Sequence, residues 1–184
     1  YHDLESVCFK KFFFKKKIIG ISLKKPILKD LLVSTISKGT PIANSSVMIR
    51  KKILIKIKGI NENKKLIASE DYNTWLRAAQ ITDNFKYINL RLGFFLIHEG
   101  STQKKKNLSI PQKEAVLNFL NLLNKRQKLK LDVKLKYLSG SFNFSLNKKY
   151  TAIKDFLFVI KYGSYNLKLK SLIKIIALYF YSFK

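Results

Sequence analysis

The sequence predicts an α/β domain followed by a helical region. Two apolar runs rich in β-formers, residues 85–88 and 92–97, come after a segment with the apolar spacing of an amphipathic helix. Beyond residue 108, apolar positions recur mainly at helical spacing. We therefore expect residues 1–108 to form the α/β domain and residues 109–184 to form a basic helical C-terminal region.

Composition and charge narrow the class of protein. The chain has 184 residues, of which 47% are hydrophobic, enough for one domain of ordinary size or a domain with a helical tail. Its formal net charge of +26 favours association with phosphate groups or with an anionic membrane face. Cys8 is the single cysteine, which excludes an internal disulfide and a cysteine-based zinc site and suits a reducing compartment.

The most ordered segment is a helix expected from Ser69 to Gln80. Ser69 is a favourable N-cap residue, and Glu70 and Asp71 fall in the first turn, where the helix dipole favours negative charge. Apolar positions then follow at helical spacing, namely Tyr72, Trp75, Leu76 and Ala79. This helix would present two carboxylates at its exposed N-terminal end.

The N-terminal segments are less sharply defined. Tyr1 to Cys8 fits either the end of a strand or a chain-end loop, and its mixed composition favours the loop. Phe9 to Lys17 interleaves phenylalanines with lysines, a pattern that fits a solvated loop or a contact with lipid. Pro26, the helical apolar spacing that follows it, and Gly39 predict a helix from about Lys25 to Lys38.

The next segments are short. Ile42 to Ile49 contains β-formers around small polar residues and predicts a buried strand. Lys51 to Lys58 alternates Ile and Leu with Lys, which leaves a strand and a short helix open. Gly59 to Ala68 is expected to be a loop, and Asn89 to Arg91 separates the two β-rich runs.

Helices dominate the expectations for the C-terminal region. Ser109 followed by Gln112 is a capping-box signature. Leu129 to Tyr137 alternates strictly, which favours a strand locally, whereas its surroundings favour a helix. A helix is expected to end at Gly163. The last apolar stripe is too short to span a bilayer, and it either lies on a membrane or packs on the protein's own core. It consists of Leu169, Leu172, Ile173, Ile176 and Phe180.

Several enzyme classes lack support. The sequence has no glycine-rich phosphate loop, no paired Cys-x-x-Cys and no Gly-x-Ser-x-Gly, which argues against nucleotide hydrolases, zinc fingers and serine hydrolases. It also has no Asp-x-Asp.

An ordered series of residues between Ile42 and Ser101 resembles family 2 glycosyltransferases. The series begins with Asn-Ser-Ser-Val at residues 44–47 and Arg-Lys at 50–51, continues with Ser-Glu-Asp-Tyr-Asn-Thr-Trp-Leu-Arg at 69–77, and ends with Phe-Leu-Ile-His-Glu-Gly-Ser at 95–101. It is similar to the C-terminal half of the family's catalytic domain. The resemblance implies that residues 1–108 form part of a GT-A (nucleotide-diphospho-sugar transferase-like) domain whose N-terminal nucleotide-binding half is missing. It also implies a helix over residues 51–58.

The resemblance assigns roles to the acidic helix. Direct displacement at a sugar carbon needs a carboxylate that takes the proton of the acceptor hydroxyl. The resemblance gives this role to Asp71 and places Glu70 beside it to orient the acceptor or the loop. The alternative is that both acids only satisfy the helix dipole.

Further residues are implied less directly. Trp75, Arg77 and Ser45 are candidates for acceptor binding, although Trp75 fits a core position equally well, Arg77 fits pairing with an acid or phosphate, and Ser45 fits a satisfied core hydroxyl. His98 is a candidate metal ligand because the family's histidine at this strand end reaches the metal or the diphosphate. Leu96 occupies the position where the family usually has arginine.

The resemblance also implies the cofactor, the partners and the location. The family holds a divalent cation, Mn²⁺ or Mg²⁺, through an Asp-x-Asp that this chain lacks. The expected donor is a nucleotide sugar and the expected acceptor a glycan or lipid-linked molecule, in cell-surface polysaccharide synthesis. We expect a cytoplasmic protein, peripheral on an anionic membrane surface, and a chain that is inactive without its missing half.

Two rival classes remain open. A basic nucleic-acid-binding or ribosomal protein fits the net charge, but the basic residues are spread along the chain, Lys dominates Arg, and no RNA-binding module is recognisable. These features argue against nucleic acid as the partner. A structural helical protein on a membrane surface fits the C-terminal stripe.

Overall fold

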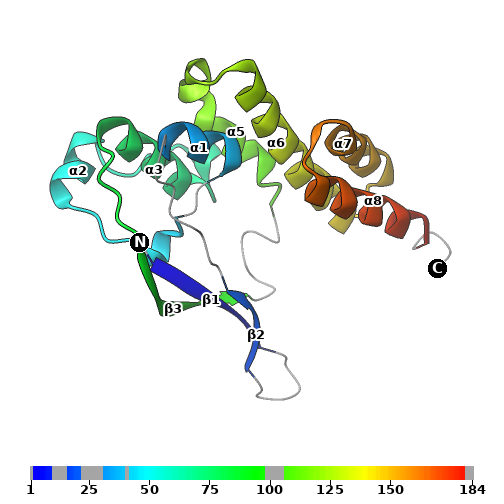
Figure 1. The fold of residues 1–184 in the computed structure, drawn as a ribbon, viewed down its shortest axis with the longest axis horizontal. Helices are drawn as coiled ribbons and strands as arrows, with labels where there is room; N and C mark the ends of the chain where they lie inside the picture. The colour runs from blue at the N-terminus through cyan, green and yellow to red at the C-terminus, as the bar shows by residue number, and fades with distance from the viewer. Residues whose placement is uncertain (1, 10–15, 22–30, 40–41, 98–105, 181–184) are drawn as a thin grey trace.

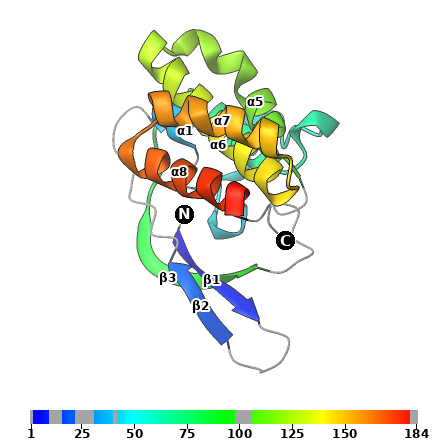
Figure 2. The ribbon, with the colours of Figure 1, turned by 90° about the vertical axis from the view of Figure 1, so that its right-hand side faces the viewer.

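The computed structural model describes residues 2–9, 16–21, 31–39, 42–97 and 106–180. This part of the chain is predominantly α-helical, and a small three-stranded sheet lies to one side of the helices (Figures 1 and 2). The prediction of an α/β fold with a partial GT-A domain is therefore wrong. Two segments with β-like sequence patterns, residues 42–49 and 129–137, do not form strands.

The sheet has the order β2-β1-β3 and is mixed. Its central strand β1 (His2–Phe9) pairs in antiparallel fashion with β2 (Lys16–Ile21) and in parallel fashion with β3 (Ile88–Ile97). The favoured prediction of a loop at the N-terminus is wrong for the residues of β1. The two predicted β-rich runs are also corrected, because β3 continues without a break through residues 89–91.

The first group of helices surrounds the acidic segment. It comprises α1 (Leu31–Lys38), a 3₁₀ turn η1 (Asn44–Ser46), α2 (Lys51–Lys56), a second 3₁₀ turn η2 (Lys64–Leu66) and α3 (Glu70–Ile81). The helix expected from Ser69 to Gln80 is confirmed as α3. The helix α1 confirms the second part of the one expected from residue 25, and residues 25–30 lie outside the described chain.

The predicted strand from Ile42 to Ile49 is wrong for a local reason. Ser46 donates from its amide to the carbonyl of Ala43 at 3.0 Å and from its hydroxyl to the same oxygen at 2.9 Å. These bonds close the turn η1 and offer the backbone an alternative to sheet pairing. The alternating segment after it is helical, which settles the choice left open for residues 51–58 in favour of α2.

The second group of helices forms the C-terminal half. It comprises α5 (Ser109–Val116), a 3₁₀ segment η3 (Leu117–Leu122), α6 (Lys125–Ser145), α7 (Lys149–Tyr162) and α8 (Tyr165–Phe180). The alternating segment 129–137 is helical within α6, and α7 ends before Gly163 as expected. None of the described helices combines the length and the apolar character needed to cross a bilayer.

The capping box predicted at Ser109 is wrong. Leu108 occupies the N-cap position of α5, and the hydroxyl of Ser109 donates to Oδ1 of Asn107 at 2.7 Å. A capping box forms instead at the start of α6. There the amide of Gln127 donates to Oδ1 of Asn124 at 2.9 Å, and the amide of Asn124 donates to Oε1 of Gln127 at 2.8 Å.

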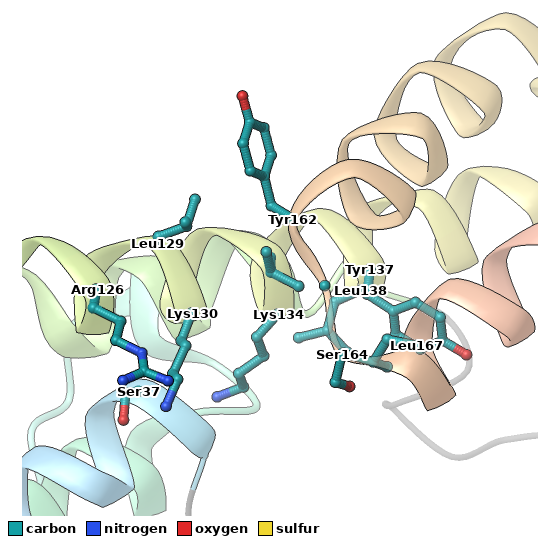
Figure 3. A pocket seen from close by; sticks show the side chains of 12 residues that line it. Ser37, Arg126, Leu129, Lys130, Lys134, Tyr137, Leu138, Tyr162, Ser164 and Leu167 are labelled. Carbon is teal, nitrogen blue, oxygen red and sulfur yellow. The ribbon is translucent and has the colours of Figure 1, made fainter.

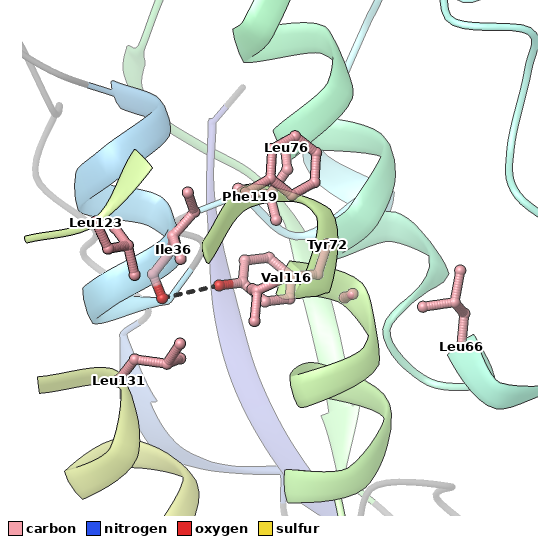
Figure 4. Packing of buried hydrophobic residues seen from close by; sticks show 9 residues of the cluster. Ile36, Leu66, Tyr72, Leu76, Val116, Phe119, Leu123 and Leu131 are labelled. Atoms are coloured by element: carbon pink, nitrogen blue, oxygen red, sulfur yellow. Dashed lines mark hydrogen bonds between the residues drawn. The ribbon is translucent and has the colours of Figure 1, made fainter. Parts of the chain in front are cut away.

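The main hydrophobic core joins both groups of helices. It gathers buried side chains from α1, α3, α5, η3 and α6, so residues on either side of the boundary expected at residue 108 share it (Figure 4). At its centre, the hydroxyl of Tyr72 donates to the carbonyl oxygens of Thr35 at 2.9 Å and Ile36 at 3.1 Å. The helix α3 is therefore held by apolar packing and by hydrogen bonds to α1.

A smaller core holds the last three helices together. Phe156 of α7 is fully buried with Ala152 and Leu178. Gly140 of α6 allows this packing, because a Cβ atom there would lie 2.9 Å from Cε1 of Phe156. The close approach of α6 and α7 thus depends on the absence of a side chain at Gly140.

Candidate functional site

A strained turn leads into α3. Ala68 has a φ of 77°, in the left-handed region that residues with a side chain rarely occupy. The turn is fixed by the amide of Ser69, which donates to the carbonyl of Leu66 at 2.7 Å, and Ser69 is itself 1% exposed. Such conformations cost about 1–3 kcal/mol and persist where the surrounding structure enforces them, often at functional sites.

The prediction that Ser69 begins the helix is confirmed, but its side chain does not cap it. Ser69 lies at the N-cap position without a side-chain cap bond, and its hydroxyl donates instead to the carbonyl of Ala68 at 2.8 Å. The two acids that follow, Glu70 and Asp71, therefore provide the negative charge at the positive end of the α3 dipole.

The two carboxylates occupy different environments at this helix end. Asp71 is half-buried, and its Oδ1 accepts a hydrogen bond from the amide of Tyr72 at 2.7 Å. Oε2 of Glu70 is buried and has no hydrogen-bond partner among the described residues. Burying a polar atom without a partner costs about 1–3 kcal/mol or more, which marks Glu70 as a residue whose position needs an explanation beyond stability.

Trp75 lies in the interior. Its side chain is 5% exposed, and its Nε1 is buried without a hydrogen-bond partner among the described residues. This placement corresponds to the core role that the sequence left open beside acceptor binding.

Arg77 binds backbone carbonyls. Its Nη1 donates to the carbonyl of Ile57, its Nη2 to the carbonyl of Gly59 at 2.8 Å, and its Nε to Oδ1 of Asn73 at 2.9 Å. Burial lowers the pKa of the guanidinium. The structure thus uses Arg77 to hold the segment after α2 against α3, and Ile57 and Gly59 were not foreseen as its partners.

The remaining predicted site residues are Ser45 and His98. Ser45 is exposed on η1, whereas its neighbour Ser46 is buried. His98 lies outside the described residues. Within the described ranges, no three His, Cys, Asp or Glu side chains come together as a metal site. The expectation of Mn²⁺ or Mg²⁺ stays a prediction.

Tyr72 and Asn73 were missed as positioning residues. Burial raises the pKa of the Tyr72 hydroxyl well above its ordinary value, so this group stays protonated and donates to α1. Nδ2 of Asn73 donates to the carbonyl of Ala115 at 3.0 Å. The available signal was the polar pair Asn73 and Arg77, which stand four residues apart and therefore on one side of the helix.

The apolar stripe of α8 faces outward. Leu169, Leu172, Ile173, Ile176 and Phe180 are 46–74% exposed, and the buried residues of the helix are Ser171 and Leu178. Packing on the protein's own core, one of the two predicted alternatives, does not account for this exposure.

Lys174 of α8 is held against α6 and α7. Its Nζ donates to the hydroxyl of Ser141 at 2.7 Å and lies 4.9 Å from the ring centroid of Tyr137 and 5.6 Å from that of Phe156. The ammonium group is therefore held among the helices by a hydrogen bond and cation–π contacts.

Comparison with protein-family models, with curated proteins and with solved structures found no match. The resemblance to family 2 glycosyltransferases stays a prediction that rests on the residue series itself.

Proposed function

We propose that this protein acts in the transfer of a sugar from a nucleotide-sugar donor to a glycan or lipid-linked acceptor, with Asp71 as the base. The observation that carries the proposal is the pair of carboxylates at the N-terminus of α3. Asp71 is held by the amide of Tyr72, and Glu70 beside it has a buried oxygen without a partner among the described residues. The residue series at 44–51, 69–77 and 95–101 supplies the class of reaction.

To act as the base in sugar transfer, Asp71 must be ionised and must lie close to the acceptor hydroxyl. The acceptor oxygen attacks the anomeric carbon, a new carbon–oxygen bond forms, and the bond from that carbon to the nucleotide diphosphate breaks. The proton of the acceptor hydroxyl passes to Asp71, and the bonding electron pair leaves with the diphosphate. Glu70, beside Asp71, would orient the acceptor or the loop.

The surroundings of the acids suit such a role. A catalytic side chain works best when a rigid element and a second layer of contacts hold it in place. Tyr72 ties the first turn of α3 to α1, and Arg77 ties the middle of the helix to Ile57 and Gly59. The strained turn at Ala68 fixes the entry of the chain.

Sugar transfer itself is the test of this proposal. Membranes from cells that express the complete coding sequence would be incubated with a panel of radiolabelled UDP-, GDP- and dTDP-sugars, and label in lipid-soluble and polymeric products would be counted. We expect transfer from at least one donor, above membranes that lack the protein. No transfer from any donor would contradict the proposal.

A second function, attachment to an anionic membrane, is favoured by the exposed stripe of α8. Exposed apolar side chains next to lysines suit insertion into the boundary between headgroups and acyl chains. Lys170 is exposed and Lys168 half-buried, and lysines near such a surface contribute about 1 kcal/mol each. Attachment would place the protein peripherally on the cytoplasmic membrane face, near a lipid-linked acceptor.

Flotation with vesicles tests the attachment. Wild type should float with vesicles that contain anionic phospholipid and should do so less as salt is raised. The variant Ile173→Ser/Ile176→Ser should lose most of this binding, whereas Leu157→Ser, an exposed apolar residue on α7, should not. Absence of binding at low salt, or equal loss in both variants, would contradict attachment through α8.

A further inference from the structure

A cavity of about 650 Å³ lies where α6 meets α1 and the junction of α7 and α8. Its volume falls within the range of about 300–1,000 Å³ that is typical of small-molecule sites. Figure 3 shows basic side chains of α6 toward one end, beside Ser37 of α1, and apolar and aromatic side chains toward the other. The cavity is therefore amphipathic along its length.

Three cations form the basic end. Arg126, Lys130 and Lys134 stand four residues apart on α6, so they share one face of the helix and follow one another at about 6 Å. Arg126 and Lys130 are exposed and Lys134 is half-buried. No carboxylate is among the described residues that line the cavity, and Nζ of Lys134 lies 4.8 Å from the ring centroid of Tyr72.

The other end offers apolar surface. Leu138 of α6 and Leu167 of α8 line it, with Tyr137 beside them and Gly163 at the junction of α7 and α8. A ligand that filled only the basic end would leave this surface exposed to water. A ligand that also covers it gains the free energy of apolar burial, about 25 cal/mol per Å².

We propose that this cavity binds a phosphate monoester or diphosphate carried on an apolar chain. Arg126 would bind phosphate oxygens through its planar fork of N–H donors, and Lys130 would add a point charge beside it. The apolar chain would lie against Leu138 and Leu167. This ligand site is separate from the carboxylates of α3, and its existence does not depend on sugar transfer or on attachment through α8.

A nucleic acid is a poorer fit to the same residues. The cationic row spans about 12 Å over two steps of four residues. Nucleic-acid surfaces instead carry basic residues along an extended face. The apolar end of the cavity also favours a ligand with an alkyl or prenyl chain over a nucleic acid.

Calorimetric titration of the full chain with octyl phosphate, below the concentration at which it forms micelles, tests the proposal. Arg126→Gln/Lys130→Gln removes two cations that line the cavity. Lys125→Gln/Lys128→Gln removes the same charge from exposed positions on the same helix that do not line it. All four positions are exposed, so both variants should fold, and circular dichroism verifies this.

We expect wild type and the Lys125/Lys128 variant to bind octyl phosphate alike, and the Arg126/Lys130 variant to bind about tenfold more weakly or worse, since each lost charged hydrogen bond weakens the complex. Inorganic phosphate should bind more weakly than octyl phosphate, and octyl glucoside should not bind in the cavity. Equal affinity in both variants, or equal affinity for inorganic and octyl phosphate, would overturn the proposal.

A second experiment, with vesicles, distinguishes a membrane lipid from a soluble phosphate ester as the ligand. Vesicles of phosphatidylcholine with phosphatidic acid present the same headgroup in a membrane. If the variants differ with octyl phosphate, and the Arg126/Lys130 variant also binds vesicles more weakly than the Lys125/Lys128 variant, the result supports the site with a membrane lipid as its ligand. A difference between the variants with octyl phosphate alone supports the site with a soluble phosphate ester. If the two variants behave alike with octyl phosphate and with vesicles, the proposal is overturned.

Discussion

Nη2 of Arg77 donates a hydrogen bond to the carbonyl oxygen of Gly59 at 2.8 Å. The same guanidinium binds the carbonyl of Ile57, so one side chain holds both sides of the turn that follows α2. Since Arg77 stands on the acidic helix α3, this contact links the position of Glu70 and Asp71 to the segment before η2.

Arg77→Lys should destabilise the protein. A lysine ammonium cannot reproduce the planar fork that reaches two carbonyls and Asn73 at once. We expect a loss of about 1–3 kcal/mol in the free energy of unfolding, measured by urea denaturation. Arg50→Lys, at an exposed position, is the matched control and should change little. Equal stability of the two variants would mean that the Arg77 contacts do not hold the turn.

Tyr72 should make stability depend on alkaline pH. Because burial raises its pKa in the folded state, the unfolded chain loses this proton first, above about pH 10, and the free energy of unfolding then falls as pH rises. Tyr72→Phe lacks this term and also lacks the hydrogen bonds to Thr35 and Ile36, which costs about 1 kcal/mol near neutral pH.

Urea denaturation at about pH 8 and about pH 11 measures both effects of Tyr72. The wild type should be more stable than Tyr72→Phe at the lower pH, and its advantage should shrink or reverse at the higher. Tyr150→Phe, a change at a tyrosine that is 82% exposed, should follow wild type at both. A constant difference between wild type and Tyr72→Phe would show that Tyr72 does not titrate differently on folding.

Gly140→Ala should separate α6 from α7. The new methyl group would lie 2.9 Å from Cε1 of the fully buried Phe156 and 3.1 Å from Cβ of Asp155. Overpacking of this kind costs about 1–3 kcal/mol, more than the gain of about 1 kcal/mol in helix propensity. The midpoint of thermal unfolding should fall, whereas Asp132→Ala at an exposed position of α6 should leave it nearly unchanged. A higher midpoint for Gly140→Ala would contradict the packing described here.

Local signals in the sequence were sufficient where they agreed with one another. The start of α3 follows from Ser69, two acids and regular apolar spacing, and α7 ends as its glycine indicates. The alternation at 129–137 was ambiguous because apolar residues at every second position also include pairs four apart. In the structure Leu131 and Val133 are buried within α6, and the capping box at Asn124 fixes where that helix begins.

Local sequence patterns did not predict the contacts between segments that are distant in the chain. The strand expected at 42–49 was wrong because β-like composition there did not reveal the competing bonds of Ser46 to Ala43. The partners of Arg77 lie 18 and 20 residues before it, and those of Tyr72 lie 36 and 37 before it. The cavity that Arg126 and Leu167 line exists only once α1, α6 and α8 have packed. The two carboxylates of α3 were recognisable in advance because they are neighbours in the chain.

Asp71→Asn, made in the protein expressed from its complete coding sequence, tests the central claim most directly. Sugar transfer and donor affinity would be measured for this variant, for wild type and for Asp83→Asn, which removes an exposed acid beyond the end of α3. Loss of a general base predicts turnover reduced by about 100-fold or more with donor affinity within about twofold of wild type, and normal values for Asp83→Asn. Normal turnover of Asp71→Asn would contradict the account and leave Asp71 a helix-stabilising acid.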